Sequence, residues 1–237
     1  MYTKTYETRY GDYKDYETIK PSTVMDLVQD VSVAHSATCG YGLYDLRDMQ
    51  LAWFLHGIKV HFDKPISTKT PVTVFTAVKA MRGMISQRGC RLLQNGEVVA
   101  KTIADWFLFD VAAGKPCRMP KEMLTAYPPF DFDGDEFYHY TKPALQSPPI
   151  AYSVRISNKE IDTNKHLNNQ KSAELLMDAL PFEFAFTDMN VLYKQAAYWG
   201  DELDVCVAEI ENGYYVHLQT KAGDVCVAGT FETGDAL

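Results

Sequence analysis

The residues best suited to chemistry lie in one polar run, DTNKHLNN at residues 162–169. A carboxylate, an amide and an imidazole recur in it at every second position, as Asp162, Asn164 and His166. A carboxylate can act as a general base or a nucleophile, and an amide and an imidazole can hold a water molecule or move a proton. This combination indicates acyl transfer or hydrolysis.

Regular elements flank this run. Residues 152–157 alternate apolar and polar, as in a half-buried strand, and residues 169–180 have the pattern of a short helix that Pro181 ends. The run is therefore expected to be a strand-to-helix loop, where the unpaired N–H groups of the first helical turn favour negative charge. Asn168 and Asn169 are of a type that caps helices, so capping is the simpler interpretation and substrate binding is the alternative.

Composition predicts a globular chain. Of its 237 residues, 46% are hydrophobic and 23% are charged. No apolar run approaches the roughly 18–20 residues that span a bilayer, and the N-terminus lacks the apolar core of a signal peptide. Five cysteines without a CxxC pair favour a reducing compartment. We therefore expect a cytoplasmic protein with no membrane span, and no metal site at His56 and His61, which lack neighbouring ligands.

Basic residues are concentrated in one part of an acidic chain. The net charge is −8, yet residues 59–121 hold eleven Lys and Arg against four Asp and Glu, a local balance of +7 that leaves −15 elsewhere. These charges either solvate strand faces or form a docking surface for an acidic partner, such as a phosphopantetheine carrier protein. An acidic chain is a poor candidate for binding nucleic acid, so no such partner is expected.

The first half has the pattern of a strand, a long helix and an antiparallel meander. Apolar residues at helical spacing predict a helix over residues 22–38, with Ser22 as its cap and Gly40 as its stop. The apolar stripe of this helix includes Val24, Val28 and Val31. The Asn95-Gly96 pair predicts a tight hairpin turn between the last two of the strands expected at 2–10, 53–62, 72–78, 86–93 and 98–110.

The second half repeats this order after a linker. Residues 116–149 hold seven of the eleven prolines and an acidic cluster, as expected of a segment laid over the surface. A strand, the polar loop, a helix and further strands follow, with Asp15 aligned to Asp162 at an offset of 147. We therefore expect two domains, residues 1–117 and 150–237, joined by a linker over 118–149.

Four stretches carry a resemblance to a known family. They are Trp53-Phe54-Leu55 leading into Ile58-Lys59-Val60, the strand Pro71-Val72-Thr73-Val74, the loop at 162–169, and Val191-Leu192-Tyr193-Lys194 with Gly200-Asp201-Glu202-Leu203. Together they resemble the acyl-acyl carrier protein (acyl-ACP) thioesterase family over nearly the whole chain, and the DxNxHxNN loop is the most specific of them. The resemblance implies an α+β fold of two hotdog domains, each an antiparallel sheet wrapped around a central helix.

The resemblance also implies a function. The chain would release free fatty acid from acyl-ACP without a metal or other cofactor, with the second half catalytic and the first half forming most of the acyl pocket. The partner would be acyl carrier protein bearing a fatty acyl phosphopantetheine, and the chain a monomer (an internal pseudo-dimer) or a homodimer. The residues matching the catalytic loop are Asp162, Asn164 and His166. Candidate substrate-binding residues are Val24, Val28, Val31, Trp53, Asn168, Asn169 and Gln195.

One position departs from the family pattern. The family has a glutamate after the Tyr-Lys-x step of the later strand, whereas Tyr193-Lys194-Gln195 is followed here by Ala196. A general base typically contributes about 10²–10⁴-fold to the rate, so we expect a slow enzyme in which Asp162 is either the nucleophile or the base. The alternatives are a thioesterase acting on coenzyme A esters and a non-catalytic acyl-binding hotdog protein.

Overall fold

A computed structural model describes residues 1–234, which form two compact units. The first runs from Met1 to Tyr140, and the second begins at Thr141. The last three residues of the expected second domain, 235–237, lie outside the described residues. No helix among the described residues is long and apolar enough to cross a membrane.

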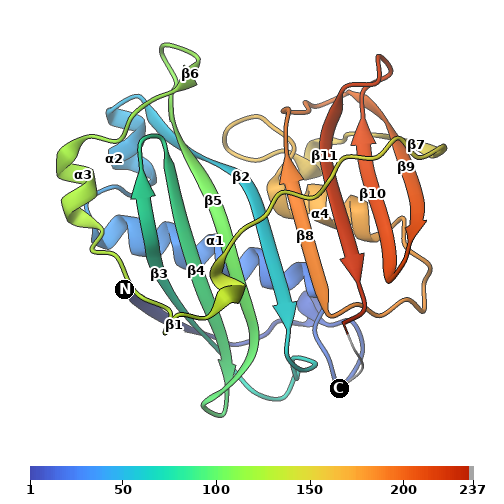
Figure 1. The fold of residues 1–237 in the computed structure, drawn as a ribbon, viewed down its shortest axis with the longest axis horizontal. Coiled ribbons are helices and arrows are strands. Elements are labelled where there is room, and N and C mark those ends of the chain that lie inside the picture. The colour runs from blue at the N-terminus through green and yellow to red at the C-terminus, as the bar shows by residue number, and fades with distance from the viewer. Residues whose placement is uncertain (235–237) are drawn as a thin grey trace. The chain divides into compact units, whose positions relative to one another are not determined.

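The first unit is an antiparallel sheet with one long helix against it (Figure 1). Its elements are β1 (Tyr2–Tyr6), α1 (Pro21–Thr38), α2 (Leu43–Asp48), β2 (Leu51–Phe62), β3 (Val72–Arg82), β4 (Ile85–Gln94), β5 (Glu97–Asp110), β6 (Lys115–Pro116) and α3 (Lys121–Ala126), with 3-10 turns at Tyr10–Asp12 and Glu136–Tyr138. The strands lie in the order β1-β3-β4-β5-β2, and β6 also pairs with β5. Helix α1 packs on β1 and β3.

Helix α1 begins one residue before the predicted start. Pro21 occupies its first position, where the fixed φ of proline suits the helix and its missing N–H has no intrahelical acceptor, and Lys20 is the N-cap residue. The prediction that Ser22 caps the helix is therefore wrong, since Ser22 is buried in the first turn. The predicted stop is confirmed, because Gly40 takes φ +77°, a left-handed conformation that favours glycine.

The hairpin between β4 and β5 has the predicted turn. Asn95 and Gly96 both have positive φ, 52° and 84°, as in the two-residue turns whose twist matches that of paired strands. Along β4 the even-numbered residues from Ser86 to Gln94 are buried on one face. One of them is Arg88, so strand alternation places a guanidinium inside the unit.

Much of the segment expected as a linker packs onto the first unit. Residues 127–140, here called the strap, begin at Tyr127, whose ring meets His35 of α1, and then cross the face of the sheet opposite α1 (Figure 1). Phe132 and Tyr138 in the strap are both at most 1% exposed. The Phe132 ring lies on Gly89 of β4, where any Cβ would overlap it. The strap therefore covers part of the outer face of the sheet, and its buried aromatic side chains form a second hydrophobic layer there.

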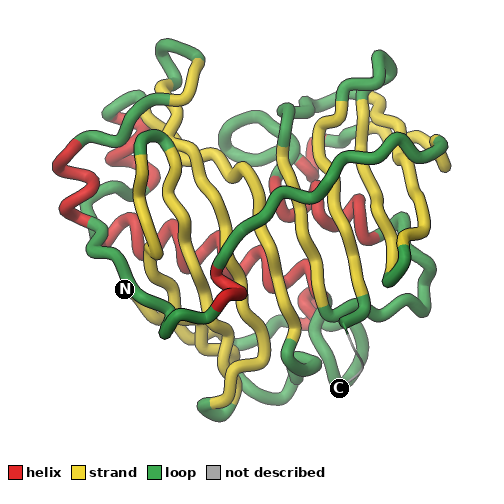
Figure 2. Tube along the Cα trace, viewed as in Figure 1, coloured by secondary structure: helices red, strands yellow, loops and turns green. Residues whose placement is uncertain are grey.

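The second unit has the same plan with a shorter helix (Figure 2). Its elements are β7 (Ile150–Arg155), a 3-10 turn at Asn158–Glu160, α4 (Asn169–Met177), β8 (Asp188–Tyr193), β9 (Glu202–Ile210), β10 (Gly213–Gln219) and β11 (Val225–Glu232). The strands are antiparallel in the order β8-β11-β10-β9-β7, and α4 packs on β10 and β11. The expected helix-and-sheet plan is therefore present twice.

The loop before the helix has equivalent geometry in both units. A β-bridge closes it between Tyr13 and Ile19 in the first unit and between Ile161 and Leu167 in the second. Tyr13 and Ile161 are 148 residues apart, and so are Ile19 and Leu167. The N-cap residues of α1 and α4 are also 148 residues apart. The predicted offset of 147 is therefore wrong by one residue. Lys14, and not Asp15, stands at the position of Asp162.

Candidate active site

The loop between β7 and α4 is a closed turn. Above the bridge from Ile161 to Leu167, the backbone N–H of Asp162 donates to the carbonyl of His166 at 2.9 Å. The N–H of Lys165 donates back to the Asp162 carbonyl at 3.0 Å, and Lys165 takes φ +64° to do so. The backbone thus fixes the direction in which the side chains of the turn leave it.

One carboxylate oxygen of Asp162 holds this turn together. Its Oδ1 accepts hydrogen bonds from the backbone N–H of Asn164 at 2.8 Å and from that of His166 at 3.3 Å. Within residues 1–234 its Oδ2 accepts no hydrogen bond. Asp162 is half-buried, so the second oxygen is the one that can take up a water molecule.

His166 is packed against an aromatic ring. It meets Tyr198 edge-on, with 5.1 Å between the ring centroids and 81° between the planes. Tyr198 is in turn fixed by its backbone N–H, which donates to the Asp201 carboxylate at 2.8 Å. The structure therefore brings the three predicted catalytic residues into one turn, where His166 and Asp162 are half-buried and Asn164 is exposed.

Two backbone hydrogen bonds connect the turn to neighbouring segments of the second unit. The N–H of Leu167 donates to the Ala197 carbonyl, and the N–H of Asn168 donates to the Glu160 carbonyl, both at 2.8 Å. The Glu160 carboxylate accepts from the backbone N–H of Ser157 at 2.6 Å and from its hydroxyl at 2.8 Å. The position of the turn is therefore set by the chain before it and by the segment after β8.

The two asparagines at the start of α4 take different positions. Asn168 is the N-cap, and its side-chain oxygen accepts from the N–H of Gln170 at 2.8 Å, as the simpler interpretation predicts. Asn169 is the first helical residue, and its carbonyl accepts from the Tyr193 hydroxyl at 2.9 Å. The start of the helix is thus bonded to the end of β8, beside the turn.

The position of the family glutamate lies close to the attachment of the turn. Ala196 is half-buried and directly precedes Ala197, whose carbonyl holds Leu167. Gln195 is exposed, and its backbone N–H donates to the Cys226 carbonyl at 3.1 Å. A side chain introduced at residue 196 would therefore start one residue away from the carbonyl that positions the catalytic turn.

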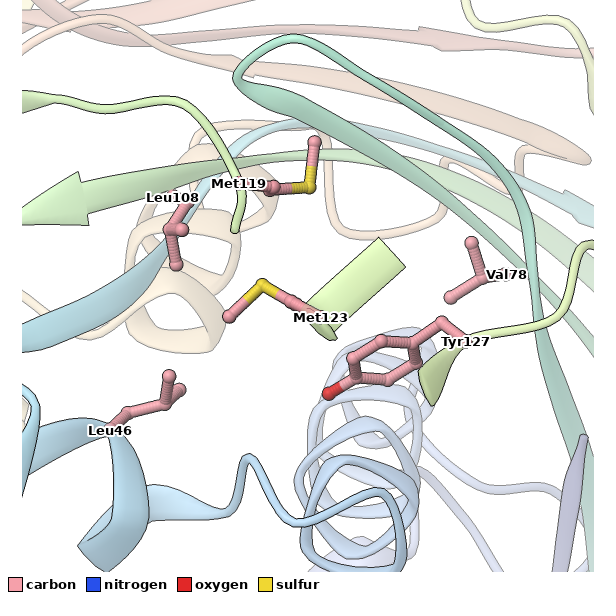
Figure 3. Close-up of a cluster of buried hydrophobic side chains, with 6 residues drawn as sticks. All are labelled: Leu46, Val78, Leu108, Met119, Met123 and Tyr127. Atoms are coloured by element: carbon pink, nitrogen blue, oxygen red, sulfur yellow. The ribbon is translucent and has the colours of Figure 1, made fainter. Parts of the chain in front are cut away.

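The candidate acyl-binding residues of the first unit lie on two elements. Val24, Val28 and Val31 are at most 2% exposed on α1. Trp53 of β2 is half-buried against a cluster of apolar side chains from α2, the sheet, α3, the segment before α3, and the strap. Figure 3 shows the cluster as Leu46, Val78, Leu108, Met119, Met123 and Tyr127. The ring of Tyr127 meets His35, one helical turn beyond Val31, at 5.7 Å between centroids. The end of the valine stripe thus adjoins the cluster.

Seven of the eleven bases in residues 59–121 have contacts within the first unit. Three pair with carboxylates of the linker or of neighbouring strands, and the others are held by Glu17, by the strap or by burial. These seven are Lys59, Lys64, Lys69, Lys79, Arg88, Arg91 and Lys101. The other four, Arg82, Lys115, Arg118 and Lys121, are exposed and form no ion pair within the described chain. Of the eleven basic residues, these four are therefore the ones whose charge is exposed and not paired within the described chain.

Sequence reasoning missed several residues around the turn and inside the first unit. Tyr198 and Glu160 position the turn. Tyr198 lies far from the polar run along the chain, so no local pattern links the two, whereas Glu160 stands two residues before Asp162 and was overlooked beside the run. The pair of His35 and Arg88 was open to prediction, since His35 lies on the apolar stripe and Arg88 at a buried position of a strand. Within residues 1–234, no group of three or more His, Cys, Asp or Glu side chains is arranged to hold a metal ion.

Comparison with known proteins matches both units. Residues 1–127 match the acyl-ACP thioesterase N-terminal domain, and residues 142–230 match the acyl-ACP thioesterase C-terminal domain. An acyl-ACP thioesterase structure from Bacteroides thetaiotaomicron is 16% identical, with a TM-score of 0.89 over 97% of this chain and 96% of that one. A 12:0-ACP thioesterase from Umbellularia californica is 14% identical, with a TM-score of 0.84 over 98% and 96%. No curated protein matches the sequence.

Two hotdog units in one chain, the second carrying a carboxylate-bearing turn before its helix, define a double-hotdog thioesterase. The matches over both units then identify the family: the chain belongs to the acyl-ACP thioesterases. It is a thioester hydrolase that releases fatty acid from acyl carrier protein. At such low identity the structural likeness establishes the fold.

Proposed function

We propose that Asp162 is the general base for hydrolysis of the thioester in acyl-ACP. Its Oδ1 is bound to the loop backbone, and its Oδ2 takes a proton from a water molecule. The hydroxide attacks the thioester carbonyl carbon to form a tetrahedral intermediate. When the C–S bond breaks, the phosphopantetheine sulfur takes the proton from Asp162. The products are the free fatty acid and the carrier-protein thiol.

His166 and Asn164 position the reacting groups in this proposal. The imidazole of His166 packs edge-on against the ring of Tyr198, which favours one orientation before substrate binds. In that orientation it can hydrogen-bond the attacking water or the departing sulfur. The exposed amide of Asn164 stands on the same turn, where it can bind the phosphopantetheine arm as that arm enters from solvent.

The start of α4 stabilises the oxyanion of the intermediate. The helix begins directly after the turn, and the Asn168 cap satisfies the N–H of Gln170. The N–H groups of a first helical turn carry partial positive charge, which favours an oxygen that becomes negative during the reaction. Asn168 and Asn169 thus contribute by placing this helix end, and Gln195 contacts the pantetheine arm from the exposed surface.

The first unit binds the acyl chain. The valine stripe of α1 and the partly buried ring of Trp53 offer an apolar surface suited to methylene groups, whose burial stabilises binding by about 0.8 kcal/mol for each CH₂. This assignment predicts that substitutions at Val28 or Trp53 change the preferred acyl length without removing the chemistry of the turn.

Four exposed bases of the first unit form the docking surface for the carrier protein. Arg82 ends β3, Lys115 lies in β6, and Lys121 is the first residue of α3, with Arg118 three residues before it. The N–H of Met119 donates to the carbonyl of Gly83 at 3.1 Å, which places the segment of Arg118 beside that of Arg82. Glu122 is the exposed acid among them, so the set remains basic and attracts an acidic carrier protein.

The five cysteines support a cytoplasmic location. All five are free thiols, two of them half-buried and three buried. Burial raises the pKa of the Cys226 thiol to about 11, with Asp201 and Asp224 adding to the shift, so this cysteine is neutral and unreactive near neutral pH. Free structural thiols of this kind suit a reducing compartment.

The observation that supports the mechanism is that Oδ1 of Asp162 is bonded to the backbone of the turn whereas Oδ2 is not. The test is release of free fatty acid from a panel of acyl-ACP and acyl-CoA esters by the purified full chain, with His166→Ala as the control. We expect hydrolysis of carrier-protein esters that falls strongly in the variant. Hydrolysis that persists unchanged in both His166→Ala and Asp162→Ala would place the chemistry outside the turn. Acyl binding without turnover would favour the non-catalytic alternative.

A further inference from the structure

A guanidinium without an anionic partner lies inside the first unit. Arg88 is 6% exposed on the inner face of β4. Its Nη1 donates to Nδ1 of His35 at 2.7 Å and to the Thr76 hydroxyl oxygen at 3.2 Å. Within residues 1–234 no carboxylate lies within 4.0 Å of this side chain, and its Nε and Nη2 make no hydrogen bond. Three of its five N–H groups are thus free for a ligand.

The side chains in contact with Arg88 are neutral. Burial, and then the charge of Arg88, lower the pKa of His35 to about 3, so His35 is uncharged near neutral pH and accepts the bond from Arg88. The His35 ring stacks on Tyr2 at 6.2 Å between centroids, and the guanidinium carbon lies 5.9 Å from the centre of the Tyr127 ring. The face of such a ring attracts a cation weakly but offers no hydrogen-bond acceptor to its free N–H groups.

An unpaired charge in this position is costly to the fold. Removing a charged group from water is unfavourable unless a partner and hydrogen bonds compensate it. Lys69, in contrast, is paired with Glu17 on the surface of the same unit. The guanidinium is planar and matches a carboxylate through two parallel hydrogen bonds. A carboxylate is therefore the group that would compensate Arg88 most completely.

The position of Arg88 indicates how such a carboxylate would be carried. His35 follows Val24, Val28 and Val31 on the same stripe of α1, so the pair formed by His35 and Arg88 stands at the end of the apolar residues assigned to the acyl chain. An aliphatic chain lying along that stripe would place its terminal group at the guanidinium. A terminal methyl group would leave the three N–H groups unpaired.

We propose that Arg88 binds the carboxylate at the end of an aliphatic chain held in the first unit. The inference rests on the proposed acyl-binding role of α1. Two sources have this chemistry: an acyl thioester with a second carboxylate at its far end, which would be a preferred substrate, and a free fatty acid, which would be a product-like inhibitor. In either case the guanidinium would make an otherwise apolar site prefer a chain that ends in a carboxylate.

The first experiment compares carrier-protein esters of equal chain length that end in a methyl, a hydroxyl or a carboxylate group. For each variant the quantity is the ratio of kcat/KM for the carboxylate-ended ester to that for the methyl-ended ester. We expect Arg88→Met to lower this ratio about 10- to 100-fold, the effect of losing a charge-assisted hydrogen bond. Arg47→Met, the same substitution on the exposed surface of α2, should leave the ratio unchanged.

The second experiment separates the two sources of carboxylate. Binding of dodecanoic acid and of dodecanol to the full chain is measured by calorimetry, with and without Arg88→Met. Stronger binding of the acid that disappears in Arg88→Met, with no effect on the ester ratio, would identify the free acid as the ligand. An ester ratio and an acid preference that are both independent of Arg88 would overturn the proposal.

Two measurements on the wild-type chain test the proposal even if the variant is not stable. If Arg88→Met does not fold, the wild-type chain decides the question: a carboxylate-ended chain that is neither hydrolysed faster nor bound more tightly than its methyl-ended equivalent overturns the proposal. Hydrolysis of the methyl-ended ester by the wild type tests the acyl-ACP mechanism separately. A chain that cleaves this ester but ignores the terminal carboxylate retains the proposed function and loses only the role of Arg88.

Discussion

The Oδ1 atom of Asp162 accepts the backbone N–H of Asn164 at 2.8 Å, two residues further along the chain. In the first unit, Oδ1 of Asp15 accepts the N–H of Glu17 at the same distance. Both aspartates therefore build turns with their side chains. Only the turn of the second unit carries a carboxylate at the first position inside its bridge and a histidine at the fifth, since Lys14 and Thr18 occupy those positions in the first unit.

This relationship allows the chemistry of Asp162 to be separated from its structural role. Asp162→Asn keeps an Oδ1 that accepts the backbone N–H groups but removes the base, so we expect acyl release to fall by about 10²–10⁴-fold with little change in Tm. The measurement is single-turnover hydrolysis of acyl-ACP together with thermal unfolding. Asp15→Asn is the matched control and should retain the wild-type rate. Equal rates for Asp162→Asn and wild type would exclude the general-base role.

Ala196 offers a test of whether the enzyme is slow because a second carboxylate is missing. The residue is half-buried and adjoins Ala197, whose carbonyl holds the turn, so Ala196→Glu should bring a carboxylate near the reacting water. We expect wild type to be faster than Asp162→Asn, and Ala196→Glu to be faster than wild type. The measurement is steady-state kcat for one acyl-ACP. A wild-type rate equal to that of Asp162→Asn, with a large gain in Ala196→Glu, would indicate a binding protein with a degenerate site.

The two-unit plan was predictable because each element has a local signal. The helix over 22–38, the Asn95-Gly96 turn and the meander of strands follow from periodicity and turn chemistry, and the structure has each of them. The strap was not predictable, because it is rich in proline and acids and has no periodicity. Its burial depends on tertiary partners such as Gly89, which provides the flat surface on which Phe132 lies.

The site was predictable where its residues are neighbours in sequence. Asp162, Asn164 and His166 form a visible pattern, and the structure places them in one turn. The contacts of that turn with Tyr198 and Ala197 span thirty residues or more, so no local pattern reveals them. The offset between the two halves was wrong by one residue because an aspartate is common in turns, whereas the β-bridges that define the true register are long-range features.

The docking surface predicts a dependence on charge and salt. Reversing two of its bases together, Arg82→Glu with Arg118→Glu, should lower kcat/KM for acyl-ACP and flatten its decline with added salt, because surface attraction is screened over about 10 Å at 0.1 M ionic strength. The same acyl group on pantetheine should be cleaved at the wild-type rate. Lys14→Glu with Lys69→Glu, the same charge change elsewhere on the unit, is the control. Equal losses from both pairs would indicate a general charge effect.

The strap predicts a large effect from a small substitution. Gly89→Ala would push a methyl group into the Phe132 ring, and overpacking of this kind typically lowers the free energy of unfolding by about 1–3 kcal/mol. Urea unfolding at neutral pH measures it. Gly11→Ala, where a Cβ meets nothing within 4 Å, should change stability by less than about 0.5 kcal/mol. Combining Gly89→Ala with Phe132→Leu should restore part of the loss, and no restoration would show that the strain lies elsewhere.

The contact between His35 and Arg88 predicts how stability depends on pH. Burial, and then the charge of Arg88, lower the pKa of His35 to about 3 in the folded chain, compared with about 6.5 when it is unfolded. The unfolded chain therefore binds a proton first as the pH falls, and the native state loses stability between about pH 6.5 and pH 3. From this residue the loss between pH 7 and pH 5 is about 2 kcal/mol.

His35→Gln isolates that contribution. The side-chain oxygen of glutamine can accept the hydrogen bond from Nη1 of Arg88, but it does not titrate. The free energy of unfolding, measured in urea at pH 7, 6 and 5, should therefore decrease less in the variant than in wild type, by about 2 kcal/mol over this range. His217, whose pKa burial also lowers, is present in both proteins and cancels in the comparison. Parallel pH profiles for the two proteins would mean that His35 becomes protonated without unfolding, and that Arg88 does not hold it neutral.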